Sequence, residues 1–431
     1  MNKNILRLAV PNIISNITIP LLGLVDMALM GHMGDEKYIG AIALGGVIFN
    51  IIYWSFGFLR MGTSGFTAQA YGERDNEKAI TTLARALLVA FSAAVLIIVL
   101  QRPVEWLSFL LISGSTGVES LAGEYFRIRI WAAPATISIF ALTGWFLGMQ
   151  NARYPMYIAI LINVINIACN FLFIFGFGMK SDGVALGTLV AQYVGLLLAL
   201  FLLWRKYRQL FSHVKREAVV EVKAMLRFFK VNSDIFLRTL CVISVFTFFT
   251  SRSAATDDTI LAVNSLLLQF LMFYSYFIDG FAFAGEALTG KYVGANNPVK
   301  LKRVIRNLFL WGGGLTVAFS SIYYFGNDFI LGILTNQPAI IEATAPFLPW
   351  VVAIPIMSTA SYIWDGIYIG ATASRGMLYS MLGATLLFYP LYFLLVGHMG
   401  NHALWLAMIM FMAGRGIFQT VMAPKYIQVG F

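Results

Sequence analysis

The chain has little charge and very little cysteine or histidine. Of its 431 residues, 12% are charged, two are cysteines and four are histidines, whereas 59% are hydrophobic. Soluble domains carry about twice this fraction of charge, so the composition excludes an ordinary soluble domain and indicates an integral membrane protein. Cys169 and Cys241 both lie within apolar runs, which favours neither a disulfide nor a zinc site. His398 and His402 have no third ligand candidate nearby, so no metal site is predicted there.

What the sequence does contain is a series of long apolar runs. A run of about twenty residues is long enough to cross a bilayer as a helix. The first run lacks a signal-peptide cleavage site and is expected to be retained. We predict twelve membrane spans, at approximately 8–32, 39–64, 79–100, 122–149, 154–176, 183–204, 226–250, 258–286, 302–325, 340–370, 377–397 and 402–423.

Basic residues predict the orientation of these spans. An even number of spans places both termini on one side, and cytoplasmic loops are enriched in Lys and Arg. With cytoplasmic termini, the outer side holds only Lys37, Arg102, Arg127, Arg129, Lys180 and Arg252. We therefore expect a multi-pass protein of the cell (inner) membrane. The net charge of +10 reflects its inner loops and does not indicate nucleic-acid binding.

The two halves of the chain repeat each other. One ungapped alignment of the halves places Thr67–Ala79, TAQAYGERDNEKA, on Thr289–Leu301, TGKYVGANNPVKL. The same alignment superimposes Gly144 on Gly366, Gly148 on Gly370 and Arg153 on Arg375, and residues that it superimposes are called repeat-equivalent. Parallel repeats of this kind occur in transporters that bind substrate between their halves.

The repeat gives the predicted architecture. We expect an all-α membrane protein of twelve transmembrane helices in two pseudo-symmetric six-helix lobes, 1–204 and 231–431. The segment 205–230, the only long basic stretch, is interpreted as a cytoplasmic linker. Part of it is expected to form an amphipathic helix on the anionic inner leaflet.

Asp26 is a carboxylate within the first apolar run. It is the only charged residue between Arg7 and Asp35, and Pro20 and Gly23, which can kink a helix, lie just before it. An ionisable group inside an apolar helix is costly and suggests an ion or substrate pathway.

Amide and hydroxyl groups are predicted to lie at the depth of Asp26. Asn163, Asn166 and Asn170 are spaced by three and four residues, so they share one helix face. Counted from the nearest turns, Asp26, Asn170 and Thr188 all lie roughly 9 Å below the outer surface. We predict a cation site formed by Asp26, Asn166, Asn170 and Thr188, with Asn163 as an accessory group.

The chemistry of this predicted site leaves alternatives open. One carboxylate with amide and hydroxyl oxygens suits sodium, and a carboxylate in a partly dry pocket suits a proton equally well. Alternatively, the asparagines only join helices. The repeat favours an ion site, because the repeat-equivalent positions are Phe248, Phe388, Tyr392 and Met410.

The second half has membrane charges of its own: Arg238, Asp279, Glu286, Asp365 and Arg415. Because unpaired charges are expensive at this depth, we expect Arg238 to pair with Asp279 or Asp365, and Arg415 with another acid. Structural or gating pairs are favoured over substrate contacts.

These motifs resemble a known family. PLLGLVDMALMGHMG, LRMGTSGFTAQAYG and DGVALGTLVAQ are similar to the first half of multidrug and toxic compound extrusion (MATE) transporters. VNSDIFLRTL, SYFIDGFAFAGEAL and WDGIYIGA resemble the DinF-like branch. The resemblance implies two six-helix lobes that rock between inward-facing and outward-facing states, and an ion site at Asp26, Asn166, Asn170 and Thr188. Some members have a second acid in place of Asn170, which leaves the coupling ion open.

The expected function is therefore transport. We predict a monomeric secondary antiporter, not an enzyme, that exports organic cations or amphipathic compounds in exchange for sodium or protons, without a cofactor. A flippase for a lipid-linked or amphipathic metabolite is the nearest alternative. An intramembrane enzyme would need a second catalytic group beside Asp26, whereas the expected neighbours are amides. A purely structural membrane protein would not need the buried charges.

Overall fold

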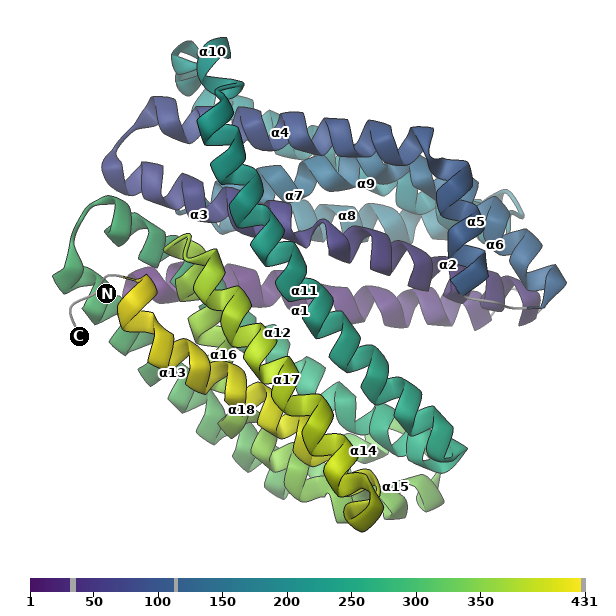
Figure 1. Ribbon diagram of the computed structural model, residues 1–431. Helices are drawn as coiled ribbons and strands as arrows, with labels where there is room; N and C mark the ends of the chain where they lie inside the picture. The colour runs from purple at the N-terminus through teal and green to yellow at the C-terminus, as the bar shows by residue number, and fades with distance from the viewer. Residues whose placement is uncertain (32–35, 112–114, 428–431) are drawn as a thin grey trace. The chain divides into compact units, whose positions relative to one another are not determined.

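Helices make up the regular structure of the chain. The computed structural model describes residues 1–31, 36–111 and 115–427, and the side chains of residues 19, 21–28, 30, 31, 36 and 111 are outside the description. The described residues form helices and no strand (Figure 1). The fold class is therefore all-α, as predicted.

The chain is a multi-pass membrane protein. Within the described residues, eleven helical segments are long and apolar enough to cross a membrane. Each overlaps one predicted span from the second to the twelfth, and α1 (Asn2–Gly31) covers the first predicted span, 8–32, as far as Gly31. The eleven segments are Lys37–Glu73, Asn76–Val99, Thr116–Gly148, Arg153–Gly176, Ser181–His213, Arg216–Thr256, Asp258–Gly294, Pro298–Phe325, Pro338–Gly370, Ser374–Met399 and Asn401–Tyr426.

Two details of the predicted spans differ in the structure. The second span is interrupted at Phe56, between α2 (Glu36–Ser55) and α3 (Gly57–Glu73). The eighth span belongs to α12 (Asp258–Gly294), which continues well beyond the predicted end at 286. An apolar run measures the part of a helix that suits lipid, whereas backbone hydrogen bonds extend a helix through polar residues as well.

The chain divides into two compact units. The N-terminal unit comprises Ile14–Phe228, and the C-terminal unit comprises Met1–Ile13 together with Phe229–Phe431. Both α1 and α11 (Val222–Thr256) therefore begin in one unit and end in the other.

The N-terminal unit contains the second part of α1, the beginning of α11 and the elements between them. After α2 and α3 these are α4 (Asn76–Val99), α5 (Gln101–Leu111), α6 (Thr116–Arg129), η1 (Ile130–Ala132), α7 (Ala133–Gly148), α8 (Arg153–Phe171), the π-helix η2 (Leu172–Gly176), α9 (Ser181–Tyr207), η3 (Arg208–His213) and α10 (Arg216–Val219). The segment predicted as a linker is thus largely helical, with η3, α10 and the start of α11.

The C-terminal unit contains the first residues of α1 and most of α11. They are accompanied by α12, α13 (Pro298–Phe325), α14 (Asn327–Leu334), α15 (Pro338–Thr344), η4 (Ala345–Phe347), α16 (Leu348–Gly370), α17 (Ser374–Met399) and α18 (Asn401–Tyr426).

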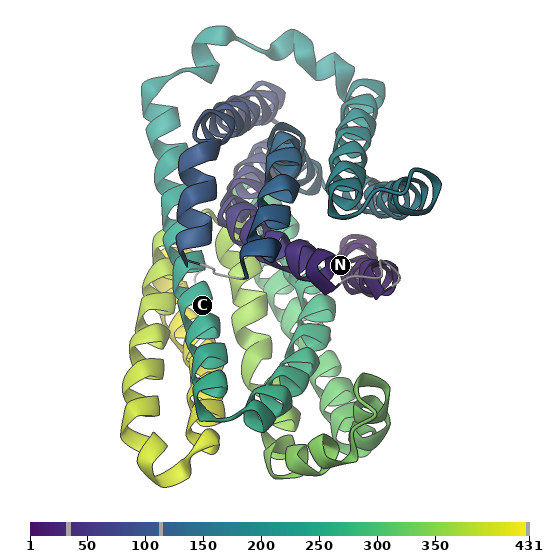
Figure 2. The same ribbon diagram turned by 90° about the vertical axis from the view of Figure 1, so that its right-hand side faces the viewer.

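The sequence repeat reappears as repeated packing. In the N-terminal unit α7 packs against α3, α4 and α9, and in the C-terminal unit α16 packs against α12, α13 and α18. The pair α8–α9 likewise corresponds to α17–α18, which run side by side in both views (Figure 1, Figure 2). The corresponding helices are those that the alignment of Thr67 with Thr289 superimposes.

Glycines allow the closest of these contacts. A Cβ on Gly144 would overlap the carbonyl oxygen of Arg60, and a Cβ on Gly366 would overlap that of Ala282. The two glycines are repeat-equivalent, and so are the residues that carry the two carbonyls. The backbones of α3 and α7, and those of α12 and α16, can therefore touch only where the side chain is absent.

The turns are repeated as well. The described non-glycine residues with positive φ form two repeat-equivalent pairs, Arg74 with Asn296 and Gln150 with Thr372. Asp75 and Asn297, which are also repeat-equivalent, each cap the next helix by accepting a backbone N–H bond, of 2.8 and 3.0 Å.

Candidate functional site

The predicted amide groups form a hydrogen-bonded chain in the N-terminal unit. Asn170 Nδ2 donates to Asn166 Oδ1 at 3.1 Å, and Asn166 Nδ2 donates to Thr188 Oγ1 at 3.0 Å. Thr188 Oγ1 donates in turn to the carbonyl oxygen of Val184, at 3.0 Å. Both asparagines are buried. The chain thus links α8 to α9 through side chains whose oxygens suit a hard cation.

Local helix geometry explains this arrangement. Asn166 and Asn170 are four residues apart on α8, so they lie on one face, and Thr188 bonds the carbonyl four residues earlier in α9. The helix then continues directly into the π-helical turn η2. Such turns are rare and occur frequently at functional sites.

The other two predicted members of this site are both connected with α1. Asn163 Nδ2 donates to the carbonyl oxygen of Thr18 in α1, at 3.3 Å. The side chain of Asp26, also in α1, lies outside the described residues. The structure therefore brings Asn166, Asn170 and Thr188 together and connects Asn163 to the backbone of α1.

Gly187 is a residue of this region that the sequence did not single out. It is buried in α9, and a Cβ at this position would overlap Oδ1 of Asn170. The amide of Asn170 can therefore occupy its position only because residue 187 has no side chain. Gly187 immediately precedes Thr188, but no spacing rule connects it to a residue on α8.

The repeat-equivalent positions form an aromatic cluster in the C-terminal unit. Phe248 of α11 corresponds to Asp26, and Phe388 and Tyr392 of α17 correspond to the two bonded asparagines. The ring centroid of Phe248 lies 5.8 Å from that of Phe388 and 5.2 Å from that of Tyr392. These three positions of the repeat unit are therefore neighbours in the C-terminal unit, where the fold places aromatic rings.

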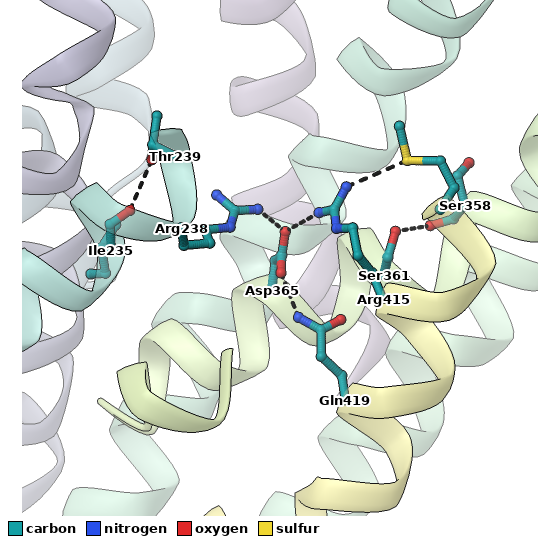
Figure 3. Close-up of polar contacts among 9 residues, drawn as sticks. Ile235, Arg238, Thr239, Ser358, Ser361, Asp365, Arg415 and Gln419 are labelled. Carbon is teal, nitrogen blue, oxygen red and sulfur yellow. Dashed lines mark hydrogen bonds and ion pairs between the residues drawn. The ribbon is translucent and has the colours of Figure 1, made fainter. Parts of the chain in front are cut away.

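The C-terminal unit has a charged cluster centred on Asp365 of α16 (Figure 3). Its Oδ2 accepts hydrogen bonds from Arg238 of α11 and from Arg415 of α18, the latter at 2.6 Å. Its Oδ1 accepts from Nε2 of Gln419, also at 2.6 Å. Arg238, Asp365 and Arg415 together carry one net positive charge, and each side chain is at most 11% exposed.

Arg415 is enclosed by groups that favour a guanidinium. Its Cζ lies 5.6 Å from the ring centroid of Phe411 and 5.9 Å from that of Tyr362. Its Nη1 donates to Sδ of Met412 at 3.4 Å. Aromatic faces attract cations most strongly where water is excluded, so these rings help to hold the second arginine beside a single acid.

The other two predicted acids of this half lie on α12. Asp279 interacts electrostatically with Arg238. Glu286 is fully buried, and its backbone carbonyl oxygen faces Gly370 of α16.

The pair of Arg238 with Asp365 is one of the two predicted alternatives, whereas the prediction for Arg415 was wrong and Gln419 was not predicted. Asp365 is one of the two acids expected for Arg238, but Arg415 uses the same acid and not another one. Figure 3 shows the reason, since the carboxylate lies between the two guanidinium groups and presents one oxygen, Oδ2, to both. Gln419 was missed, although it follows Arg415 by four residues and so shares its helix face.

Comparisons with known proteins agree with this architecture. The family model MatE matches residues 11–172 and 235–394 of the chain. The Escherichia coli K12 protein "DNA damage-inducible protein F" is 36% identical, over 96% of this chain and 90% of that protein. "Probable multidrug resistance protein NorM" of Acinetobacter baylyi is 23% identical, over 94% of this chain and 92% of its own length.

A solved structure shares the fold. It is described as an outward-facing conformation of a multidrug resistance MATE family transporter of the MOP superfamily. Its TM-score is 0.84 at 21% identity, with 99% of this chain and 96% of that chain covered. Members of the family are transporters and not enzymes. With a family model that covers most of the sequence and a relative of 36% identity along nearly all of it, the chain belongs to the MatE family of membrane transporters.

Proposed function

We propose that this transporter is a secondary active antiporter that exports organic cations or other amphipathic compounds in exchange for sodium or protons. It works as a monomer in the inner membrane, with twelve spans and both termini in the cytoplasm. The names of its relatives, which include a multidrug resistance protein, support this substrate class. The observation that carries the proposal is the hydrogen-bonded chain of the buried Asn170 and Asn166 with Thr188 in the N-terminal unit.

The repeat supports Asp26 as the charged member of this site. The residue that corresponds to Asp26 is Phe248, and its ring lies against the two residues that correspond to Asn166 and Asn170. If the halves share this geometry, the carboxylate of Asp26 faces both asparagines. One carboxylate with neutral oxygens from two further helices can hold either sodium or a proton.

Exchange then requires different affinities in two states. We propose that the halves 1–204 and 231–431 move as lobes around the linker, so that Asp26 faces alternate sides of the membrane. The ion binds better in one arrangement and the substrate in the other. Only this difference in affinity between the two states couples movement of the ion to movement of the substrate. Tight binding that is equal in both states does not.

The test is transport by protein reconstituted into liposomes, with a sodium gradient and a pH gradient imposed separately. One of the two gradients should drive uptake of a fluorescent organic cation, and Asp26→Asn should abolish the gradient-dependent part. Asp328→Asn, which removes the same charge from an exposed position of α14, serves as the matched control and should keep gradient dependence. Full gradient-driven transport by a folded Asp26→Asn protein would exclude the mechanism.

A flippase for a lipid-linked or amphipathic metabolite is the competing function. The net positive charge of Arg238, Asp365 and Arg415 favours it, because a pyrophosphate-linked substrate needs cations. Against it, α12 contributes Asp279 and Glu286 to the same unit, so acids outnumber these arginines. Translocation of a pyrophosphate-linked lipid in liposomes without any ion gradient would favour this alternative.

A further inference from the structure

The beginning of α11 presents two parallel stripes of side chains to its surroundings. Val222, Leu226 and Phe229 are 69%, 64% and 47% exposed. Lys223, Arg227 and Lys230 follow them at the same spacing of four and three residues and are also exposed. Residues with this spacing share one helix face, so an apolar stripe lies beside a basic one.

The length of α11 places these stripes at the membrane surface. The helix has 35 residues and is part of a membrane-crossing segment. At 1.5 Å per residue it is about 50 Å long, whereas the hydrocarbon layer is about 30 Å thick. Its first turns, which follow the basic segment, therefore extend into the headgroup region.

Nearby acids do not neutralise the basic stripe. Glu221 pairs with Arg85 at 3.9 Å, and Glu77 pairs with Lys215 at 2.7 Å. In the described part of the chain, Lys223, Arg227 and Lys230 have no carboxylate within ion-pair distance. Between Arg205 and Lys230 the sequence has eight Lys and Arg residues against Glu217 and Glu221.

Arg85 holds the preceding turn in place. Its Nε donates to the carbonyl oxygen of Val219 at 3.1 Å, and its Nη2 donates to that of Ala218. A cation at the C-terminal carbonyls of α10 fixes where α11 begins. The hydrogen bond to Glu77 raises the pKa of Lys215, so this second anchor remains charged. The stripes are thus presented by a fixed helix start and not by a loose loop.

We propose that the start of α11 is a binding site for anionic phospholipid headgroups. Leu226 and its apolar neighbours enter the acyl boundary, and Lys223, Arg227 and Lys230 bind the headgroup phosphates. Charge complementarity selects this occupant, because an apolar stripe alone would suit any lipid.

The test is lipid binding, which does not depend on the transported substrate. Native mass spectrometry of the detergent-purified full chain counts the phosphatidylglycerol and phosphatidylcholine molecules bound at increasing lipid concentration. The wild type should bind phosphatidylglycerol in preference. The triple variant Lys223→Gln, Arg227→Gln and Lys230→Gln should lose at least about tenfold in that affinity. Leu226→Ser should weaken binding of both lipids.

A second basic cluster provides the matched control. Lys302, Arg303 and Arg306 of α13 are exposed, whereas their apolar neighbours Leu301, Val304 and Ile305 are buried. Changing these three basic residues to Gln removes the same charge and should leave phosphatidylglycerol affinity within about twofold. An equal loss in both triple variants would reduce the effect to general surface charge and overturn the site. Unchanged phosphatidylglycerol affinity in the triple variant of Lys223, Arg227 and Lys230 would overturn the site as well. So would a wild-type dimer that Leu226→Ser converts to a monomer, because the apolar stripe would then bind a second copy of the chain.

Discussion

At the scale of single residues, the charged cluster of the C-terminal unit depends on Asp365. Two arginines share this one buried carboxylate. Asp365→Asn removes the negative charge and leaves both cations buried together. We expect this change to lower the free energy of unfolding by about 3 kcal/mol or more, measured by chemical denaturation in detergent.

A second substitution separates charge balance from loss of packing. Adding Arg238→Gln to Asp365→Asn removes one excess cation and should restore part of the lost stability. The exposed Glu342, changed to Gln, should shift stability by less than about 0.5 kcal/mol and serves as the control. If adding Arg238→Gln instead lowered the stability of Asp365→Asn further, charge imbalance would not be the cause of the stability lost in Asp365→Asn.

Gly187 tests the amide chain without changing a polar group. In Gly187→Ala the new Cβ would displace Oδ1 of Asn170. We expect an overpacking cost of about 1–3 kcal/mol in unfolding free energy, together with weaker binding of the coupling ion. Gly46→Ala on α2 is the matched control, because a Cβ there has no atom within 4 Å. Unchanged ion affinity in a destabilised Gly187→Ala protein would show that the position of the Asn170 amide does not affect ion binding.

At the scale of helices, the two units should respond alike at equivalent contacts. Gly144→Ala and Gly366→Ala each place a Cβ against a backbone carbonyl of a neighbouring helix, which is rigid and cannot rotate away. We expect both to destabilise their unit by about 1–3 kcal/mol. Gly313→Ala on α13, where a Cβ has no atom within 4 Å, should be neutral or stabilising. Thermal unfolding of the three variants in one detergent compares them directly.

Helix-level features were the most predictable part of the fold. Apolar runs located the spans, and the alignment of the two halves matched helices, turns and glycine contacts in the two units. The interruption at Phe56 was not predictable, because the apolar run continues through it. A hydrophobic pattern indicates whether a segment suits lipid or water, but it does not indicate where the helical backbone hydrogen bonds are interrupted.

Side-chain partners across helices were less predictable. The sequence identified the charges of the second half but not their sharing of Asp365, because that depends on the distance between helices far apart in the chain. Arg238 and Asp365 are separated by 127 residues. By contrast, the pairing of Asn166 with Asn170 was predicted from spacing on one helix, and the same spacing could have pointed to Gln419 beside Arg415. Local spacing was therefore informative, and non-local pairing required the structure.

At the scale of the whole molecule, ion–substrate exchange implies that the two ligands oppose each other's binding. If the ion at Asp26 and the substrate favour different arrangements of the lobes, each must lower the affinity of the other by the same factor. We expect this factor to be about 5–150, the usual range for coupled sites. Equilibrium binding of a fluorescent organic cation, measured with and without sodium and at two pH values, gives one side of the cycle. Binding of the ion with and without that cation gives the other.

Asp26→Asn decides whether the coupling passes through the proposed carboxylate. In this variant the factor should fall to about one while substrate affinity without the ion is retained, because only the ion's preference for one arrangement has been removed. The Asp365→Asn and Arg238→Gln double variant should keep the factor, since its changes lie in the C-terminal unit, outside the amide chain. A factor that persists in Asp26→Asn and disappears in the double variant would move the coupling site to the charged cluster around Asp365.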